Sequence, residues 1–153
     1  MSEMTSSVAQ SEGDGLDDAA DLEALSSRVL LAEDDDELRR LLAQALRRDR
    51  HVVIEARNGL ELLSAIGSAS LVRPEEQHVD LVISDIRMPG ATGLDALRLL
   101  RLYSPLVPMI LITAFGDEET RAEASRWGAD AVFDKPLDID ELRATVWTFL
   151  QQG

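Results

Sequence analysis

The chain has 153 residues, the length of one ordinary domain. Its 15 Lys and Arg residues against 29 Asp and Glu residues give a net charge of −14, which disfavours direct binding to nucleic acid or to an anionic membrane surface. The absence of Cys excludes disulfides, thiol catalysis and Cys-ligated zinc, and two His residues are too few for a His-rich metal site. No apolar run reaches the roughly 20 residues that span a bilayer, and the N-terminus lacks a signal-peptide pattern, so we predict a cytoplasmic protein with no membrane insertion.

Residues 1–27 differ in composition from the rest of the chain. They contain seven acidic residues and no Lys or Arg, so this segment carries half of the net negative charge. Its first fifteen residues are rich in Ser, Gly and acids, and they offer too little apolar surface to offset the entropic cost of ordering. We therefore predict an acidic disordered tail over residues 1–27, either a solubilising leader or a partner-binding segment, followed by a folded domain over residues 28–153.

From Arg28 onward, short apolar runs alternate with helical patterns. The runs that predict buried strands are Val29–Ala32, Val52–Ile54, Val79–Ser84, Val107–Ile112 and Ala131–Phe133. The segments that predict helices are Leu38–Leu46, the stretch from Asn58-Gly59 to Ile66, Leu94–Leu102, Asp117–Trp127 and Leu142–Leu150. Gly128 stands where a helix C-terminus favours glycine. Residues 68–78 are polar and contain Arg73-Pro74, so we predict a loop there.

Five strand–helix pairs predict an α/β fold, with a doubly wound, five-stranded parallel sheet and helices on both faces. Ligands of such sheets bind beyond the carboxyl ends of the strands. Chemically useful residues follow four of the predicted strands: Glu33, Asp34 and Asp35 after the first, Asp85 after the third, Thr113 after the fourth and Lys135-Pro136 after the fifth.

Carboxylates that converge at these strand ends would raise one another's pKa, and Mg²⁺ or a Lys would compensate their charge. The chemistry that fits is phosphoryl transfer, with Asp85 as the carboxylate nucleophile. Mg²⁺ and Lys135 would neutralise the phosphoryl oxygens, and the Thr113 hydroxyl would donate a hydrogen bond to one of them. Each residue alone also has a structural explanation: Asp35 or Asp36 could be only a helix N-cap, and Lys-Pro is commonly a turn. Their order along the chain is what indicates a site.

Four motifs together resemble the receiver domain of two-component response regulators, of the stand-alone, chemotaxis-regulator-like type. They are Leu30-Leu31-Ala32-Glu33-Asp34-Asp35 with Arg39 downstream, Asp85-Ile86-Arg87-Met88-Pro89 with Gly93, Ile112-Thr113-Ala114, and Asp134-Lys135-Pro136. The resemblance runs from about Arg28 to the C-terminus. It implies a flavodoxin-like fold with strand order 2-1-3-4-5, and a phosphoryl group that reaches Asp85 from a phosphohistidine of a partner histidine kinase or histidine phosphotransfer protein.

The resemblance also implies a role for each site residue. Glu33 and Asp34 form the acidic pair at the Mg²⁺ ion. Asp34, Asp85 and the backbone carbonyl of Arg87 are the protein ligands. Thr113 is the switch hydroxyl, Lys135 binds the phosphoryl group, and Gly93 permits the turn into the third helix.

One position departs from the usual receiver pattern, and two others resemble positions that tune it. Receivers often carry an aromatic residue three positions before the Lys, where this chain has Val132, and Phe133 beside it should point to the opposite face of the sheet. We therefore expect the output signal to rest on movement of the loop at residues 113–116. Arg87 and Phe115 resemble positions that tune dephosphorylation, and as a bulky pair they would shield the acyl phosphate from water.

We predict a single-domain response regulator that is not an enzyme beyond weak self-phosphorylation and self-dephosphorylation. It would signal to a downstream protein target through protein–protein contacts, since the residues after Lys135 suffice only for the last helix. One alternative is a phosphorylation-independent docking module. Another is a Mg²⁺-dependent phosphatase, although Arg87 stands where such enzymes commonly place a second acid. Trp127 would either pack against the sheet edge or belong to a docking face.

Overall fold

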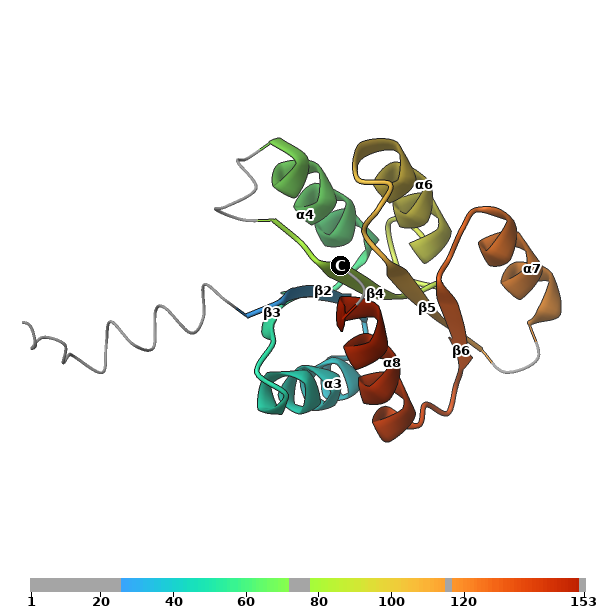
Figure 1. Cartoon of the computed structure of the whole chain (residues 1–153). Helices are drawn as coiled ribbons and strands as arrows, with labels where there is room; N and C mark the ends of the chain where they lie inside the picture. Colours follow the sequence, from blue (N-terminus) through green and yellow to red (C-terminus); the bar gives the residue numbers. More distant parts are fainter. Residues whose placement is uncertain (1–25, 72–77, 115–116, 152–153) are drawn as a thin grey trace, which may run out of the picture.

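The computed structural model describes residues 26–71, 78–114 and 117–151, which form a parallel sheet with helices on both faces (Figure 1). The strands stand in the order β3-β2-β4-β5-β6, and every neighbouring pair is parallel. Their bounds are β2 (Arg28–Ala32), β3 (Val52–Ala56), β4 (Leu81–Asp85), β5 (Met109–Thr113) and β6 (Ala131–Asp134). Counted along the chain, this is the order 2-1-3-4-5, so the predicted flavodoxin-like fold class is confirmed.

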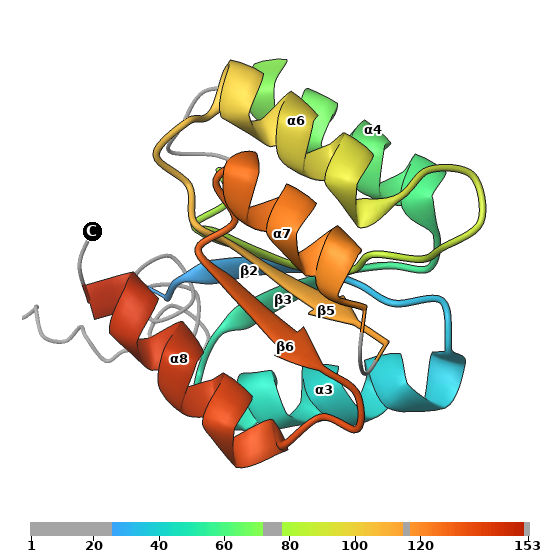
Figure 2. The same cartoon turned by 90° about the vertical axis from the view of Figure 1, so that its right-hand side faces the viewer.

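One helix follows each strand, and the helices divide between the two faces. The bounds are α3 (Asp36–Arg48), α4 (Gly59–Leu71), α6 (Gly93–Tyr103), α7 (Glu118–Arg126) and α8 (Ile139–Gln151). Figure 2 shows α3 and α8 on one side of the sheet and α4, α6 and α7 on the other. The division follows from right-handed crossovers that change direction after β3.

The central strands read as continuous apolar runs because both of their faces are covered. Every residue of β4 and β5 is buried. Alternate side chains enter two separate cores: Leu30, Val82 and Leu111 pack toward α4 and α6, whereas Leu31 and Ile83 pack toward α3 and α8. Each helix therefore needs only one apolar stripe, as the sequence pattern predicted.

Several predicted boundaries are wrong by a few residues. The third and fourth strands begin later than predicted, at Leu81 and Met109. Val79 and Val107 lie in the preceding loops and still pack partly buried against the core, which explains their apolar character. The loop predicted from residue 68 was also wrong at its start, since α4 continues to Leu71. The polar appearance of this stretch comes from Ser68 and Ser70, whereas Ala69 and Leu71 between and after them favour a helix. Residues 72–77 lie outside the described part, as do residues 1–25, so the acidic tail stays a prediction.

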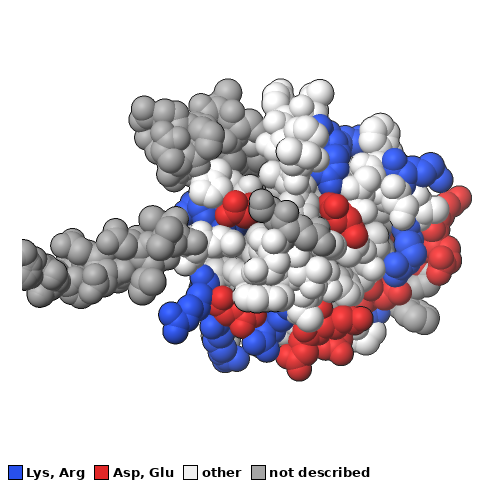
Figure 3. All heavy atoms as spheres, viewed as in Figure 1, with Lys and Arg blue, Asp and Glu red and all other residues white. Residues whose placement is uncertain are grey.

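In Figure 3, charged side chains of both signs lie mostly around a broad area of uncharged side chains, with basic groups near the end of α3 and acidic groups near the start of α8. A clamp joins these two helices: Arg143 Nε donates to Asp49 Oδ2 at 2.9 Å and Arg143 Nη2 to Asp49 Oδ1 at 2.8 Å. Asp49 is the C-cap of α3. In the described part of the chain, no helix is long and apolar enough to cross a lipid bilayer.

The clamp should make stability depend on pH. The hydrogen bond from Arg143 lowers the pKa of Asp49 below its ordinary 3.8. A lowered carboxylate pKa stabilises the fold above pH 3.8, and this stabilisation is lost as the pH falls through the folded-state value. We expect Arg143→Met to lower the urea midpoint of unfolding at pH 7, and we expect this difference from wild type to shrink toward pH 3. Asp140→Asn is the control, because it removes only the exposed second partner of Arg143. Equal midpoints at pH 7 would contradict the prediction.

Candidate metal site at the strand ends

The carboxyl ends of four adjacent strands bring the predicted site residues to one edge of the sheet. Glu33 directly follows β2, Asp85 ends β4, Thr113 ends β5, and Lys135 directly follows β6. The register pairs Asp85 with Ile112 and Thr113 with Asp134 across neighbouring strands. Parallel pairing therefore assembles the site from residues that lie up to about a hundred positions apart in the sequence.

Three carboxylates form a compact cluster at this edge. One ligand oxygen from each of Glu33, Asp34 and Asp85 lies within 4.8 Å of the others. Glu33 is fully buried, Asp85 is 5% exposed and Asp34 is exposed, so the cluster opens to solvent on one side. Oxygen ligands with room for water are what Mg²⁺ prefers in proteins.

Lys135 compensates part of this negative charge. Its Nζ lies 2.7 Å from Asp85 Oδ2 and 3.4 Å from Glu33 Oε1. Burial acts to lower the pKa of Lys135, but the hydrogen bond and charge of Asp85 outweigh burial and raise it. Lys135 thus carries a fixed positive charge beside the carboxylate that the sequence predicted as the phosphoacceptor.

Glu33 is held in an environment that disfavours its charge. Burial raises the pKa of Glu33 to about 7, and the charge of Asp85 adds to this effect. Opposing them, the backbone N–H of Asp35 donates to Glu33 Oε2 at 3.0 Å. Lys135 is close but does not restore the ordinary pKa of this carboxyl.

Two buried oxygens of the site have no hydrogen-bond partner among the described residues. They are Glu33 Oε1 and Thr113 Oγ1. Leaving a buried polar atom unpaired costs about 1–3 kcal/mol, and such atoms usually have a functional reason. A divalent cation would satisfy the carboxylate oxygen, and an oxygen of an incoming anion would satisfy the hydroxyl. The residues present therefore fit Mg²⁺.

Arg87 lies next to the Asp85 carboxylate. Its backbone N–H donates to Asp85 Oδ1 at 3.3 Å, while its guanidinium Nη2 pairs with Asp117 Oδ2 at 3.0 Å. The metal contact predicted for its carbonyl oxygen stays a prediction. Phe115, its predicted shielding partner, lies outside the described residues.

Gly93 allows α6 to start directly against the end of β4. A Cβ atom at this position would lie 2.7 Å from the backbone oxygen of Asp85 and 3.0 Å from Leu111 Cδ2. The Gly93 N–H donates to Ile86 O at 2.9 Å, so the glycine closes the loop after β4. The predicted turn function of Gly93 thus agrees with the packing.

Arg39 has a structural role that the sequence pattern did not predict. This guanidinium is 6% exposed, and its Nη1 donates to the backbone oxygen of Glu33 at 2.9 Å. It also pairs with Asp36 at 2.7 Å and with Glu55 at 3.1 Å. Arg39 therefore fixes the chain at the point where the acidic pair begins. Its position among the apolar residues of α3 was the available signal, because a buried Arg requires partners.

Other strand-end residues have structural roles. Asp35 is the N-cap of α3, and its Oδ1 accepts from the Leu38 N–H at 3.0 Å, as its alternative interpretation proposed. Val132 packs toward α4 and α6 while Phe133 packs toward α3 and α8, which confirms their predicted opposite directions. Trp127 is 46% exposed, and its ring centre lies 4.8 Å below the Arg98 guanidinium carbon.

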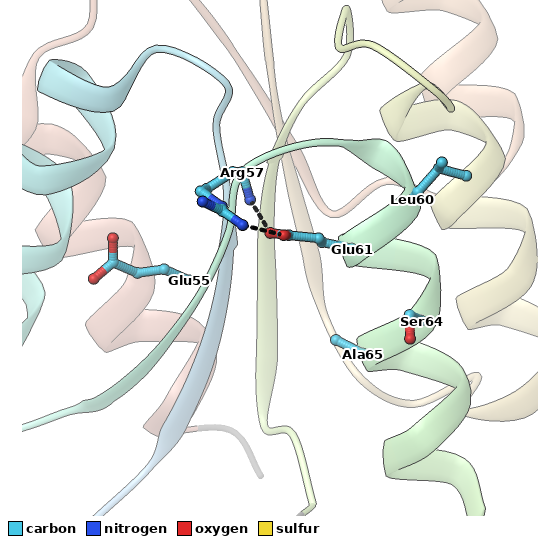
Figure 4. A pocket seen from close by; sticks show the side chains of 6 residues that line it. All are labelled: Glu55, Arg57, Leu60, Glu61, Ser64 and Ala65. Carbon is cyan, nitrogen blue, oxygen red and sulfur yellow. Dashed lines mark hydrogen bonds and ion pairs between the residues drawn. The ribbon is translucent and has the colours of Figure 1, made fainter.

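The hollow drawn in Figure 4 is separate from the strand-end cluster. It has a volume of about 580 Å³ beside the edge strand β3, and Glu55, Leu60 and Ser64 are among the residues that line it. Arg57 and Glu61 lie across it and are joined at 2.9 Å between Nη2 and Oε2. Their charges are mutually satisfied, so this hollow offers no free charged group from that pair.

The sequence model of the response regulator receiver domain matches residues 29–147, and the chain therefore belongs to this family. Receiver domains are phosphoacceptor switches of two-component systems, are generally not classed as enzymes, and bind Mg²⁺ at an acidic pocket. They receive their signal from histidine kinases or phosphotransfer proteins. The predicted family is thus confirmed.

Two curated relatives and two solved structures illustrate the similarity. Regulatory protein AtoC of Escherichia coli is 36% identical over 82% of this chain, which spans only 25% of AtoC. Sporulation initiation phosphotransferase F of Bacillus subtilis is 28% identical over 82% of this chain and 95% of its own length. The response regulator protein TrrA from Thermotoga maritima, solved in complex with Mg(2+)-BeF, has a TM-score of 0.68 and 30% identity over 80% of this chain and 98% of its own. The receiver domain of the Francisella response regulator 1452 has a TM-score of 0.72 and 25% identity over 83% and 98%.

Proposed function

We propose that this receiver accepts a phosphoryl group on Asp85 from the phosphohistidine of a histidine kinase or histidine phosphotransfer protein. The observation that carries the proposal is the position of the Asp85 carboxylate. It is 5% exposed, 2.7 Å from a lysine ammonium and within 4.8 Å of two further carboxylates. Among these carboxylates, Asp85 is the one that a lysine holds in hydrogen-bond contact.

In the proposed reaction, a carboxylate oxygen of Asp85 attacks phosphorus in line with the bond that breaks. The bond between phosphorus and the imidazole nitrogen of the partner breaks, and the imidazole keeps the electron pair. Lys135 neutralises developing charge on the phosphoryl oxygens. The Thr113 hydroxyl, which has no hydrogen-bond partner in the described structure, donates to one of those oxygens.

The proposed Mg²⁺ ligands are the carboxylates of Asp34 and Asp85 and the backbone carbonyl of Arg87, with Glu33 completing the acidic pair. When bound, Mg²⁺ supplies positive charge that neutralises phosphoryl oxygens. Support comes from Glu33, whose buried Oε1 accepts no hydrogen bond from the described residues and whose pKa is raised. A bound dication would coordinate this oxygen and would stabilise the charged form of the carboxyl.

The wider organisation belongs to the same proposal. We infer an acidic tail over residues 1–27, a receiver domain from residue 28, a cytoplasmic location and a downstream protein target that responds to changed contacts. Sporulation initiation phosphotransferase F is a relative that this chain matches over nearly its whole length, whereas AtoC is a longer relative in which the match is to one part. Weak self-phosphorylation and self-dephosphorylation complete the proposal.

Phosphorylation from a small-molecule donor tests the proposed acceptor. We expect radiolabelled acetyl phosphate with Mg²⁺ to label the wild-type chain up to one equivalent. Asp85→Asn should reduce the label to background, and so should chelation of Mg²⁺. The matched control is Asp140→Asn, which removes an 88% exposed carboxylate of α8 that does not belong to the strand-end cluster. It should be labelled like wild type.

Other results would favour the alternatives. A wild-type chain that takes no label from any phosphodonor, while it still binds a partner, supports the phosphorylation-independent docking module. Equal labelling of Asp85→Asn and wild type would show that the acceptor lies elsewhere. Hydrolysis of a phosphomonoester beyond one equivalent would support the phosphatase.

A further inference from the structure

The backbone of Arg87 contacts the Asp85 carboxylate, whereas its side chain points away from this carboxylate. Its backbone N–H reaches Asp85 Oδ1 at 3.3 Å, so the residue begins within one hydrogen bond of the carboxylate. The guanidinium is 74% exposed and turns instead to Asp117, with Nη2 3.0 Å from Asp117 Oδ2. Among the described contacts, this ion pair is the one that holds the Arg87 side chain.

Asp117 has two separate tasks, one on each carboxylate oxygen. Its Oδ1 accepts the backbone N–H of Thr120 at 3.3 Å, which makes Asp117 the N-cap of α7. Its Oδ2 accepts the guanidinium of Arg87. The cap contact does not depend on the ion pair, so Arg87 can leave while the first turn of α7 stays capped.

We propose that Asp117 is a positioning residue that holds the Arg87 guanidinium away from Asp85, and that a phosphoryl group on Asp85 competes with Asp117 for this guanidinium. The inference rests on the proposed function, because it requires Asp85 to carry the phosphoryl group. It adds the Arg87 guanidinium to Lys135 as a second cation that binds the phosphoryl group. It also describes a contact between the loop after β4 and α7.

The competition favours the phosphoryl group on physical grounds. A phosphoryl group carries about −1.5 to −2 charge on three strong acceptor oxygens, against −1 for the Asp117 carboxylate. A guanidinium pairs with phosphate through two parallel hydrogen bonds, which suits Arg better than Lys. Lys135 and Thr113 would each donate to one phosphoryl oxygen in the proposed function, and each such oxygen can accept more than one hydrogen bond.

The consequence falls on α7, which a second ion pair ties to the sheet. Arg121 Nη2 lies 2.6 Å from Asp134 Oδ1, and Arg121 Nη1 donates to Val132 O at 3.1 Å. Release of Arg87 would remove the tie at the start of α7 and leave the tie to β6. With Val132 in place of an aromatic ring, this exchange of ion pairs offers a route from Asp85 to α7.

Binding of fluoroberyllate at saturating Mg²⁺, followed by ¹⁹F NMR, tests the competition. Asp117→Asn is the informative variant, because Asn is as good an N-cap as Asp but carries no charge. We expect it to bind fluoroberyllate about two- to fivefold more tightly than wild type, the factor that an exposed ion pair contributes. In an Arg87→Gln background, the same substitution should leave the affinity unchanged within error.

Glu123→Gln is the matched control, since it removes one negative charge from the same helix. Glu123 Oε2 pairs with Arg98 Nη2 at 3.1 Å, in an ion pair of similar length that does not involve the loop after β4. This variant should bind fluoroberyllate like wild type. Tightening by Glu123→Gln as large as that by Asp117→Asn would overturn the proposal, because it would reveal a general charge effect.

The failures of the two proposals can be told apart. Wild-type protein that binds no fluoroberyllate contradicts the proposed function, and the inference about Asp117 falls with it. Wild-type binding that Asp117→Asn leaves unchanged contradicts only the role of Asp117. A tightening that persists in the Arg87→Gln background also overturns that role, because the effect would then not pass through Arg87.

Discussion

Gly59→Ala should lower the free energy of unfolding by about 3 kcal/mol or more. Gly59 is the first residue of α4, and its N–H donates to Pro89 O at 3.0 Å. A Cβ atom there would overlap the backbone oxygen, nitrogen and carbon of Ala91, which belongs to the loop between β4 and α6. Backbone atoms cannot turn away as a side chain can. The helix or the loop must therefore shift as a whole, at a cost in stability.

Gly67→Ala on the same helix is the matched control and should act in the opposite direction. A Cβ atom at Gly67 meets nothing within 4 Å. We expect a gain of about 0.5–1 kcal/mol, because Ala is the better helix former. Urea unfolding of both variants measures the contrast. Equal effects of the two substitutions would show that helix propensity, and not the contact with Ala91, decides the result.

Glu33→Gln should stabilise the metal-free protein by about 1–3 kcal/mol at pH 8, and should abolish most of its stabilisation by Mg²⁺. Burial raises the pKa of Glu33 to about 7, above its ordinary 4.5. A raised carboxyl pKa stabilises the fold fully below pH 4.5, and this stabilisation is lost as the pH rises through 7. At pH 8 the wild type holds a buried charge that the amide avoids, whereas at pH 4.5 the advantage of the variant should vanish.

Asp34→Asn separates metal binding from burial. Asp34 is exposed, so neutralising it should leave the metal-free stability nearly unchanged while it weakens Mg²⁺ binding. Thermal unfolding with EDTA and with millimolar Mg²⁺, at pH 4.5 and pH 8, gives all the comparisons. If Glu33→Gln is less stable than wild type without metal at pH 8, the buried charge of Glu33 does not destabilise the fold, and the prediction is wrong.

The fold could be predicted from sequence because β4 and β5 are short, continuous apolar runs and the helices between the strands carry apolar residues at helical spacing. The strand-end residues could be predicted for the same reason, since parallel strands deliver their carboxyl ends to one edge. Exact strand starts could not, because Val79 and Val107 are apolar but pack against the core from loops. Apolar character reports burial, and burial does not require a strand.

Contacts between side chains that are far apart in the chain could not be predicted from the sequence. The pairing of Arg87 with Asp117 and the contact of Arg39 with the Glu33 carbonyl depend on how loops fold over the sheet edge. The chain has 29 acidic residues, and the sequence alone does not indicate which of them pairs with a given exposed Arg. Only the geometry selects one. By contrast, the position of Lys135 could be predicted, because it directly follows the last strand, two strands away from Asp85 in the same sheet.

Lys135 is also the single lysine of the chain, since the other 14 of its 15 Lys and Arg residues are arginines. Its ammonium nitrogen, 2.7 Å from Asp85 Oδ2, is consequently the one side-chain amine that an acylating or reductively alkylating reagent can modify. The rate at which Lys135 is modified therefore reports on the charge and occupancy of the carboxylate cluster. The α-amino group of the chain serves as the internal reference for this rate.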